Sequence, residues 1–198
     1  MKLNAFEYAL LTSSGRRFVQ GHFDFRQWHK LGMAPMQGGR VLDVGCGQGH
    51  AAEIAISKYS AAAVDAVDPD DRMLNKSKKR LDKFSDKARC QIASATSLPF
   101  ETECFDTVIV SQVLHHVDDW QRAIVEVVRV MKPKSQLLVV ESLAGFINNP
   151  LLKKLMKHPS ENRFYQRQLL NVLSESGLCV KNSSSMFGCF CWVVATKN

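Results

Sequence analysis

Short apolar runs alternate with amphipathic stretches along most of the chain. The runs are rich in Val, Ile, Leu and Ala and are bounded by Gly, Pro, Asp or Ser, a pattern typical of buried strands. We predict strands over residues 40–44, 61–67, 90–95, 105–112 and 136–140. In between, apolar residues recur with helical spacing, which predicts helices over residues 51–58, 71–84, 118–133 and 163–176.

The order of these elements predicts the fold class. Strands that alternate with helices form a parallel sheet with helices on both faces. Residues 178–182 and 187–196 come last and form a pair of neighbouring strands, which inserts one strand in the opposite direction. We therefore predict an α/β fold with a doubly wound, Rossmann-like sheet that is mostly parallel and has one antiparallel strand near the C-terminus.

Residues 40–49 are the most informative stretch. An apolar strand there breaks into glycines at 45, 47 and 49 and leads directly into a helical pattern. Glycine is needed where φ is positive or where a Cβ would keep the backbone away from a ligand, and free N–H groups at the start of the next helix attract polar ligand groups. The alternative is a tight turn without a ligand. The spacing also differs from the Gly-x-Gly-x-x-Gly of dinucleotide-binding proteins.

Four segments resemble the class I S-adenosylmethionine-dependent methyltransferases. Residues 41–49, V-L-D-V-G-C-G-Q-G, resemble the family's first motif, and residues 67–74 resemble its D-x-S-x-x-M sequence. Residues 94–100 resemble D-A-x-x-L-P-F, and residues 105–116 resemble the F-D-x-V and L-H-H of its small-molecule branch, which includes quinone and lipid methyltransferases. The resemblance implies the strand order 3-2-1-4-5-7-6 and S-adenosyl-L-methionine as cofactor, with S-adenosyl-L-homocysteine as product.

The resemblance also implies a set of cofactor-binding residues, and Asp68 is the first choice for the ribose hydroxyls. The full set is Asp43, Gly45, Cys46, Gly47, Gly49, Asp68, Pro69, Ser94, Ala95, Thr96, Ser111 and Gln112. The chain departs from the family pattern at Ser94, where a carboxylate usually meets the adenine amino group. A hydroxyl still accepts a hydrogen bond there but brings no charge. Lys134-Ser135 also replaces the usual Gly-Gly.

Methyl transfer requires a base only where the acceptor must lose a proton. His115 and His116 are the catalytic candidates, because they follow a strand at its carboxyl end and imidazole titrates near neutral pH. The alternative is that one caps a helix and the other packs in the core. Weaker candidates are Glu141, Tyr165, His22 and His29.

Length and composition limit the remaining choices. The 198 residues fit a single domain, 1–198, in which residues 1–37 form an N-terminal helical cap. No run approaches the roughly 20 apolar residues of a membrane span, and no signal peptide is evident, so a cytoplasmic protein is expected. The six cysteines form no C-x-x-C pair, and no metal site is predicted.

The net charge of +7 lies in the flanks of the chain. Residues 1–40 and 144–198 carry +4 and +5, whereas residues 41–143 carry −2. Such basic flanks suit an anionic substrate, a peripheral membrane contact or nucleic acid, or serve only solubility. DNA is not expected and RNA is disfavoured, because the sequence after the fourth strand lacks the motif of enzymes that methylate exocyclic amines. The oligomeric state is left open.

These observations favour one function and leave alternatives. The favoured one is methyl transfer to a small, hydrophobic or amphiphilic acceptor of the quinone or lipid kind. The first alternative is a non-catalytic or partner-dependent subunit that binds S-adenosylmethionine. The second is a protein or RNA methyltransferase that docks through its basic flanks.

Overall fold

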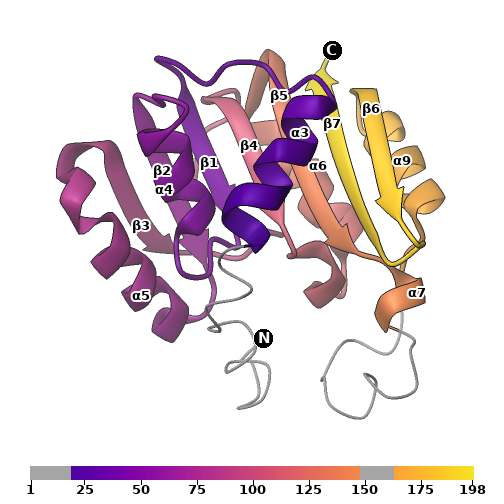
Figure 1. Cartoon of the computed structure of the whole chain (residues 1–198), viewed down its shortest axis with the longest axis horizontal. Coiled ribbons are helices and arrows are strands. Elements are labelled where there is room, and N and C mark those ends of the chain that lie inside the picture. Colours follow the sequence, from indigo (N-terminus) through magenta and orange to yellow (C-terminus); the bar gives the residue numbers. More distant parts are fainter. Residues whose placement is uncertain (1–18, 148–162) are drawn as a thin grey trace.

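The computed structural model describes residues 19–147 and 163–198. These residues form one seven-stranded sheet in the order β3-β2-β1-β4-β5-β7-β6 (Figure 1). The strands are β1 Arg40–Val44, β2 Ala63–Asp68, β3 Ala88–Ile92, β4 Phe105–Ser111, β5 Met131–Ser142, β6 Leu178–Met186 and β7 Phe190–Lys197. β7 runs antiparallel to β5 and β6, and the other pairs are parallel. The predicted fold class and strand order are confirmed.

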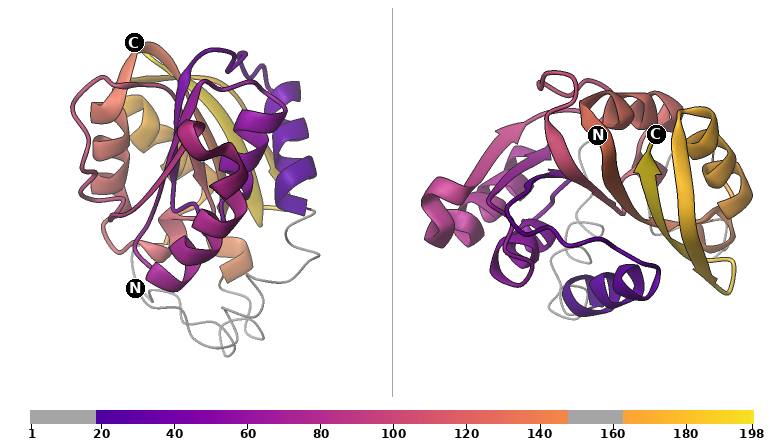
Figure 2. Two further views of the ribbon diagram at one scale, coloured as in Figure 1. Left: turned by 90° about the vertical axis from the view of Figure 1, so that its left-hand side faces the viewer. Right: turned by 90° about the horizontal axis from the view of Figure 1, so that it is seen from above.

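Helices cover both faces of this sheet (Figure 2). One face carries α3 Phe25–Lys30, α4 His50–Ser57 and α5 Asp71–Leu81, and the other carries α6 Trp120–Val130 and α9 Gln166–Glu175. The other described helices are η1 Val19–Asp24, η2 Asp82–Lys87, η3 Leu114–His116 and α7 Ala144–Ile147. None of the helices in the described part of the chain combines the length and apolar composition that a membrane crossing requires.

The central strands are apolar on both faces because each face has its own core. In β5, Leu137 and Val139 join the core under α6 and α9, whereas Leu138 and Val140 join the core under α3, α4 and α5. All four side chains are at most 1% exposed. Burying one such side chain stabilises a fold by about 1.5–3 kcal/mol, so these continuous apolar runs give strands with a strong preference for the middle of the sheet.

Two indole N–H groups fasten the N-terminal helices to the sheet. Trp28 Nε1 donates to the Val139 carbonyl at 2.9 Å, and Trp192 Nε1 donates to Asp24 Oδ1 at 2.7 Å. Apolar spacing in the sequence also predicts two short helices within residues 3–31 and another over 151–157. The first and the last of these three lie outside the described residues. That residues 1–37 form a cap on a single domain stays a prediction.

Two strands are longer than their sequence patterns predict. β5 begins at Met131 rather than at residue 136, because Lys134 adopts φ +64° and the chain bulges within the strand instead of leaving it. β6 continues to Met186, well beyond the predicted end at residue 182. Polar residues in these segments conceal strands that are held by pairing with β4 and β7.

Two further boundaries are wrong by a few residues. The helix α6 is capped by Asp119 and not by Asp118, since Asp119 Oδ1 accepts from the Arg122 amide at 3.0 Å. β3 spans Ala88–Ile92 instead of residues 90–95, because its partner β2 also ends opposite Ile92. The residues after β3 are thereby released toward the carboxyl edge of the sheet.

Candidate functional site

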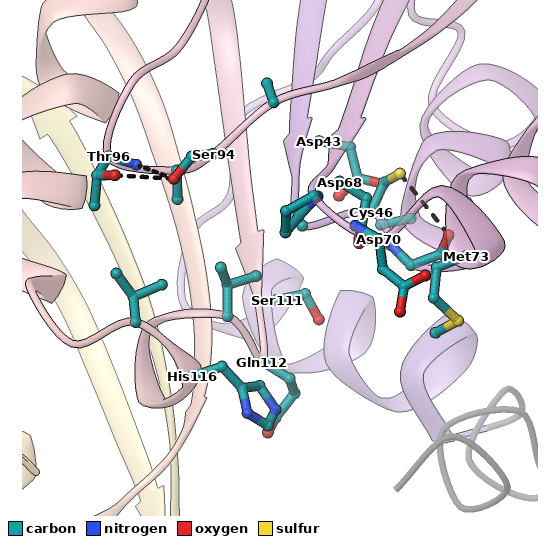
Figure 3. A pocket seen from close by; sticks show the side chains of 18 of the residues that line it. Asp43, Cys46, Asp68, Asp70, Met73, Ser94, Thr96, Ser111, Gln112 and His116 are labelled. Carbon is teal, nitrogen blue, oxygen red and sulfur yellow. Dashed lines mark hydrogen bonds between the residues drawn. The ribbon is translucent and has the colours of Figure 1, made fainter. Parts of the chain in front are cut away.

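A cavity of about 440 Å³ lies at the carboxyl ends of β1, β2 and β4 (Figure 3). It is lined by every predicted cofactor residue except Gly49, and by His116 but not His115. Ligands of doubly wound sheets bind beyond the carboxyl ends of the strands, so this is the expected place. The lining residues outside the predicted cofactor and catalytic sets are Gln48, His50, Ala51, Asp70, Met73, Ala93, Val113, Val117, Asp118 and Asp119.

The three glycines of the loop after β1 all have positive φ, but they serve different ends. A Cβ on Gly45 would lie 2.4 Å from Val113 Cγ2, and one on Gly49 would lie 2.5 Å from Ser77 Oγ. At Gly47 the nearest atom would be 3.7 Å away. Gly45 and Gly49 therefore allow the loop to pack against the protein, whereas Gly47 leaves open backbone beside the cavity.

Cys46 lies between the first two glycines and is nearly buried. Its Sγ is 3.7 Å from Ser77 Oγ. Burial, together with the nearby charges of Asp43 and Asp68, raises the pKa of the Cys46 thiol well above its ordinary value. The thiol therefore stays neutral near pH 7 and contributes packing to the cavity wall rather than a nucleophile.

Asp68 joins the glycine loop to the end of β2. Its Oδ2 accepts from the Gly47 amide at 2.9 Å and its Oδ1 accepts from the Asp70 amide at 2.8 Å. Burial raises the pKa of Asp68, although both hydrogen bonds oppose the shift. Asp70 instead caps α5 and pairs with Arg72, whose hydrogen bonds lower the Asp70 pKa. Asp68 is thus the carboxylate that belongs to the loop, and Asp70 belongs to the helix.

Asp43 lies deeper, at the end of β1, and is 1% exposed. Its Oδ2 accepts from the Ala52 amide in the first turn of α4 at 3.2 Å. Burial raises the Asp43 pKa to about 7, the hydrogen bond from Ala52 lowers it, and the charge of Asp68 raises it further. The end of β1 therefore holds an acid that titrates near neutral pH.

The loop after β3 forms another wall of the cavity. Ser94 Oγ and Thr96 Oγ1 are 2.9 Å apart, so the two hydroxyls share a hydrogen bond. Two residues of α6 hold the loop further along: Glu126 accepts from the Leu98 amide, and Arg129 donates to the Leu98 carbonyl, each at 2.9 Å. Residues of α6 therefore hold this loop in place, although Ser94 itself carries no charge.

The two candidate histidines are separated by the structure. His116 lines the cavity near Gln112 (Figure 3), whereas the His115 side chain is 5% exposed and its Nδ1 lies 2.6 Å from Glu141 Oε2. The two rings contact each other, with centroids 4.0 Å apart. Of these two histidines, only His116 is in a position to meet a ligand in the cavity.

Among the weaker candidates, Glu141, Tyr165 and His29 do not line the cavity. Tyr165 is the N-cap residue of α9 and is 58% exposed, and His29 is exposed on α3. The side chain of His22 is outside the described part of the chain. Glu141 is fully buried, and its Oε1 accepts two backbone N–H groups of the loop after β4. Burial raises the Glu141 pKa to about 8, although the hydrogen bonds from that loop oppose the shift.

Known proteins share this motif order and fold. A family model described as a methyltransferase domain matches residues 42–139, which include the glycine loop, Asp68, Ser94 and both histidines. The chain belongs to the class I S-adenosylmethionine-dependent methyltransferases. The family named by the sequence motifs is therefore confirmed.

Some relatives of this methyltransferase are named for the molecule they methylate, and others are not. The uncharacterized methyltransferase YcgJ of Bacillus subtilis (strain 168) is 34% identical over 120 residues, 60% of this chain and 46% of that protein. A demethylmenaquinone methyltransferase of Clavibacter sepedonicus is 34% identical over 109 residues, 55% of this chain and 43% of that protein. The chain spans about half the length of the curated relatives it matches.

Among solved structures, a chain in the complex between the Haloferax volcanii Trm112 methyltransferase activator and a methyltransferase superposes with a TM-score of 0.80. It is 15% identical, and the match covers 96% of this chain and 93% of that one. At this low identity, the superposition shows only that the two chains share a fold.

Proposed function

We propose that this chain binds S-adenosylmethionine in the cavity and transfers its methyl group to a small, hydrophobic or amphiphilic acceptor of the quinone kind. The observation that carries the proposal is the junction of Gly47 and Asp68. There a glycine with open backbone and a buried carboxylate meet at the carboxyl edge of the sheet. This arrangement fits a ligand that brings both hydroxyl groups and close backbone contact.

The residues of the cavity fit the cofactor. Asp68 would take the ribose hydroxyls, the glycine loop would lie against the methionine part, and the segment Ser94–Thr96 would face the adenine. The cavity volume is within the range of small-molecule sites. Five aspartates line it, and no Lys or Arg is among its described lining residues, which favours a ligand with a cationic centre.

When bound, S-adenosylmethionine supplies a methyl group on a positively charged sulfur, which is a strong electrophile. The chain's own task is then to hold the acceptor in line and to exclude water. His116 is the residue in the cavity wall that would remove a proton from an acceptor hydroxyl or acidic carbon, through a ring nitrogen of neutral imidazole. His115 would support its ring from behind.

A relative, the cavity wall and the charge of the chain support the acceptor class. The Clavibacter relative is named for a quinone, and Val113 and Val117 give the cavity an apolar side next to His116. The basic flanks would suit a cytoplasmic protein that touches a membrane surface, where such acceptors reside. The Haloferax complex supports the alternative of a subunit that works with a partner.

Calorimetric titration of S-adenosylmethionine into the wild type and Asp68→Ala tests the proposal. We expect saturable binding in the wild type and a dissociation constant about 10–100 times higher in Asp68→Ala, because a hydrogen bond to a charged group contributes about 1.5–3 kcal/mol. Asp65→Ala is the matched control. Asp65 is buried on the same strand but pairs with Arg40 away from the cavity, so its loss should leave the dissociation constant unchanged.

Three results would change the conclusion. No binding to a folded wild type would overturn the proposal. Binding without turnover of demethylated quinones would favour the non-catalytic or partner-dependent subunit. Steeply salt-dependent binding to RNA would favour the RNA methyltransferase.

A further inference from the structure

The loop Gln112–His116, which we call the histidine loop, is held in a conformation that its sequence does not favour. Gln112 has φ +59°, a left-handed conformation that side chains other than glycine rarely adopt. Such strain persists only where the surroundings determine the backbone, and it is concentrated at functional sites. The question is which contacts hold this loop.

The end of β5 supplies those contacts. Glu141 Oε1 accepts from the Val113 amide at 2.8 Å and from the Leu114 amide at 2.7 Å. Its other oxygen, Oε2, lies 2.6 Å from His115 Nδ1. The next residue, Ser142, donates its hydroxyl to the side chain of Gln112. Two side chains of β5 therefore hold four consecutive residues of the histidine loop.

The histidine loop touches both sides of the cavity. On the cofactor side, the Val113 side chain fills the space beside Gly45, where even a Cβ would come within 2.4 Å of Cγ2. On the acceptor side the loop ends in His116, whose ring rests against that of His115. Glu141 bonds directly to the backbone of Val113 and to the ring of His115. A single hydrogen bond therefore joins Glu141 to the residue that packs on Gly45, and another joins it to the residue that packs on His116.

We propose that Glu141 is a positioning residue that couples the glycine loop to His116. This inference rests on the proposed function for the roles of those two sides. A fully buried carboxyl group is costly to keep unless its partners compensate, and here three of the partners are groups of the histidine loop. Moving this one side chain would move Val113 against Gly45 and release His115 from behind His116.

The test compares Glu141→Met with Glu141→Gln and with the control Gln136→Met. Gln136 is also buried on β5, but it bonds to Ala34 and Thr107 at the opposite end of the strand. The readouts are the backbone amide NMR signals of the glycine loop, the ring C–H signals of His116, and the dissociation constant of S-adenosylhomocysteine by calorimetry.

We expect Glu141→Met to shift both sets of NMR signals and to raise the dissociation constant of S-adenosylhomocysteine at least tenfold. Glu141→Gln retains an oxygen for the two amides and an N–H for a neutral His115, so it should bind within about threefold of the wild type. Gln136→Met should leave both sets of signals and the affinity unchanged. If Glu141→Met does not fold, Glu141→Asp, which shortens the side chain by one methylene, should give smaller shifts at both sites.

The inference fails if a folded Glu141→Met or Glu141→Asp shifts only one of the two sites, or if Gln136→Met shifts both as strongly. It also fails if Glu141→Gln loses affinity as Glu141→Met does. The NMR comparison uses the ligand-free protein. A wild type that binds no S-adenosylhomocysteine would therefore overturn the proposed function, while the coupling between the two sites is still measured.

Discussion

The pKa of an aspartate is shifted in opposite directions at the two ends of the central strands. At the carboxyl end, burial raises the pKa of Asp43 to about 7. At the amino end, partial burial of Asp106 would raise its pKa, but hydrogen bonds from Lys132 and the Arg40 amide outweigh it and lower the pKa. Asp106 at the amino end is thus matched to its surroundings. Asp43, Asp68 and Glu141 at the carboxyl end have raised pKa values instead, which is typical of functional sites.

Glycines show the same contrast between the two ends. Gly38 precedes β1 at the amino end with φ +72° and has no atom within 4 Å of where a Cβ would lie. Gly45 follows β1 at the carboxyl end with φ +65° and has Val113 at 2.4 Å from that position. The first glycine only turns the chain, whereas the second also allows two loops to meet. Three predictions test the contrast.

The largest effect is expected from Gly45→Ala. The left-handed conformation and the overlap with Val113 together should lower the free energy of unfolding by about 3 kcal/mol or more, whereas Gly38→Ala pays only for the conformation, about 1 kcal/mol. Urea denaturation of both variants measures the difference. Equal losses in the two variants would mean that Val113 moves aside easily and that the two glycines are equivalent.

The second prediction concerns pH. The Asp43 pKa is raised in the folded chain, so the folded state retains a proton that the unfolded state loses, and stability falls as pH rises from 5 to 7. At 1.36 kcal/mol per pKa unit, Asp43 contributes about 2 kcal/mol to this fall. Asp43→Asn should reduce the fall by that amount and leave the part that comes from the raised pKa of Glu141. Urea denaturation at pH 5 and pH 7 is the measurement.

Asp106→Asn provides the opposite control for pH. Its pKa is lowered by its partners, so its contribution is present near pH 7 and is lost as pH falls below the ordinary pKa. The variant should therefore be less stable than the wild type at pH 7, and the fall between pH 5 and pH 7 should persist. A fall that Asp43→Asn leaves undiminished would contradict the assignment to Asp43.

The smallest effect is expected from Lys132→Met. Lys132 and Asp106 are each 42% exposed in their side chains and form an ion pair of 2.8 Å. Exposed pairs contribute about 0–1 kcal/mol and are screened by salt. Thermal unfolding should show a small loss at low salt that disappears in high salt. A loss that salt does not reduce would mean that the Lys132 stem packs against the protein instead.

Sequence patterns predict the parts of this molecule that local chemistry determines. The glycine loop and Asp68 were predicted because strand, turn and acid are close in sequence, and parallel strands bring their carboxyl ends to one edge. Glu141 received only a minor role, since its partner Val113 lies 28 residues earlier. Only the register of β4 and β5 brings them together. His115 and His116 are chemically identical neighbours, so nothing short of Glu141's position distinguishes them.

The place of β7 in the sheet has a consequence for synthesis of the chain. β7 follows all the other strands in sequence, yet it lies between β5 and β6. While the chain emerges from the ribosome, the apolar β5 therefore presents an open edge until residues 190–197 are released. Unpaired apolar edges recruit other chains, so this stretch of synthesis is when the nascent protein most needs a chaperone.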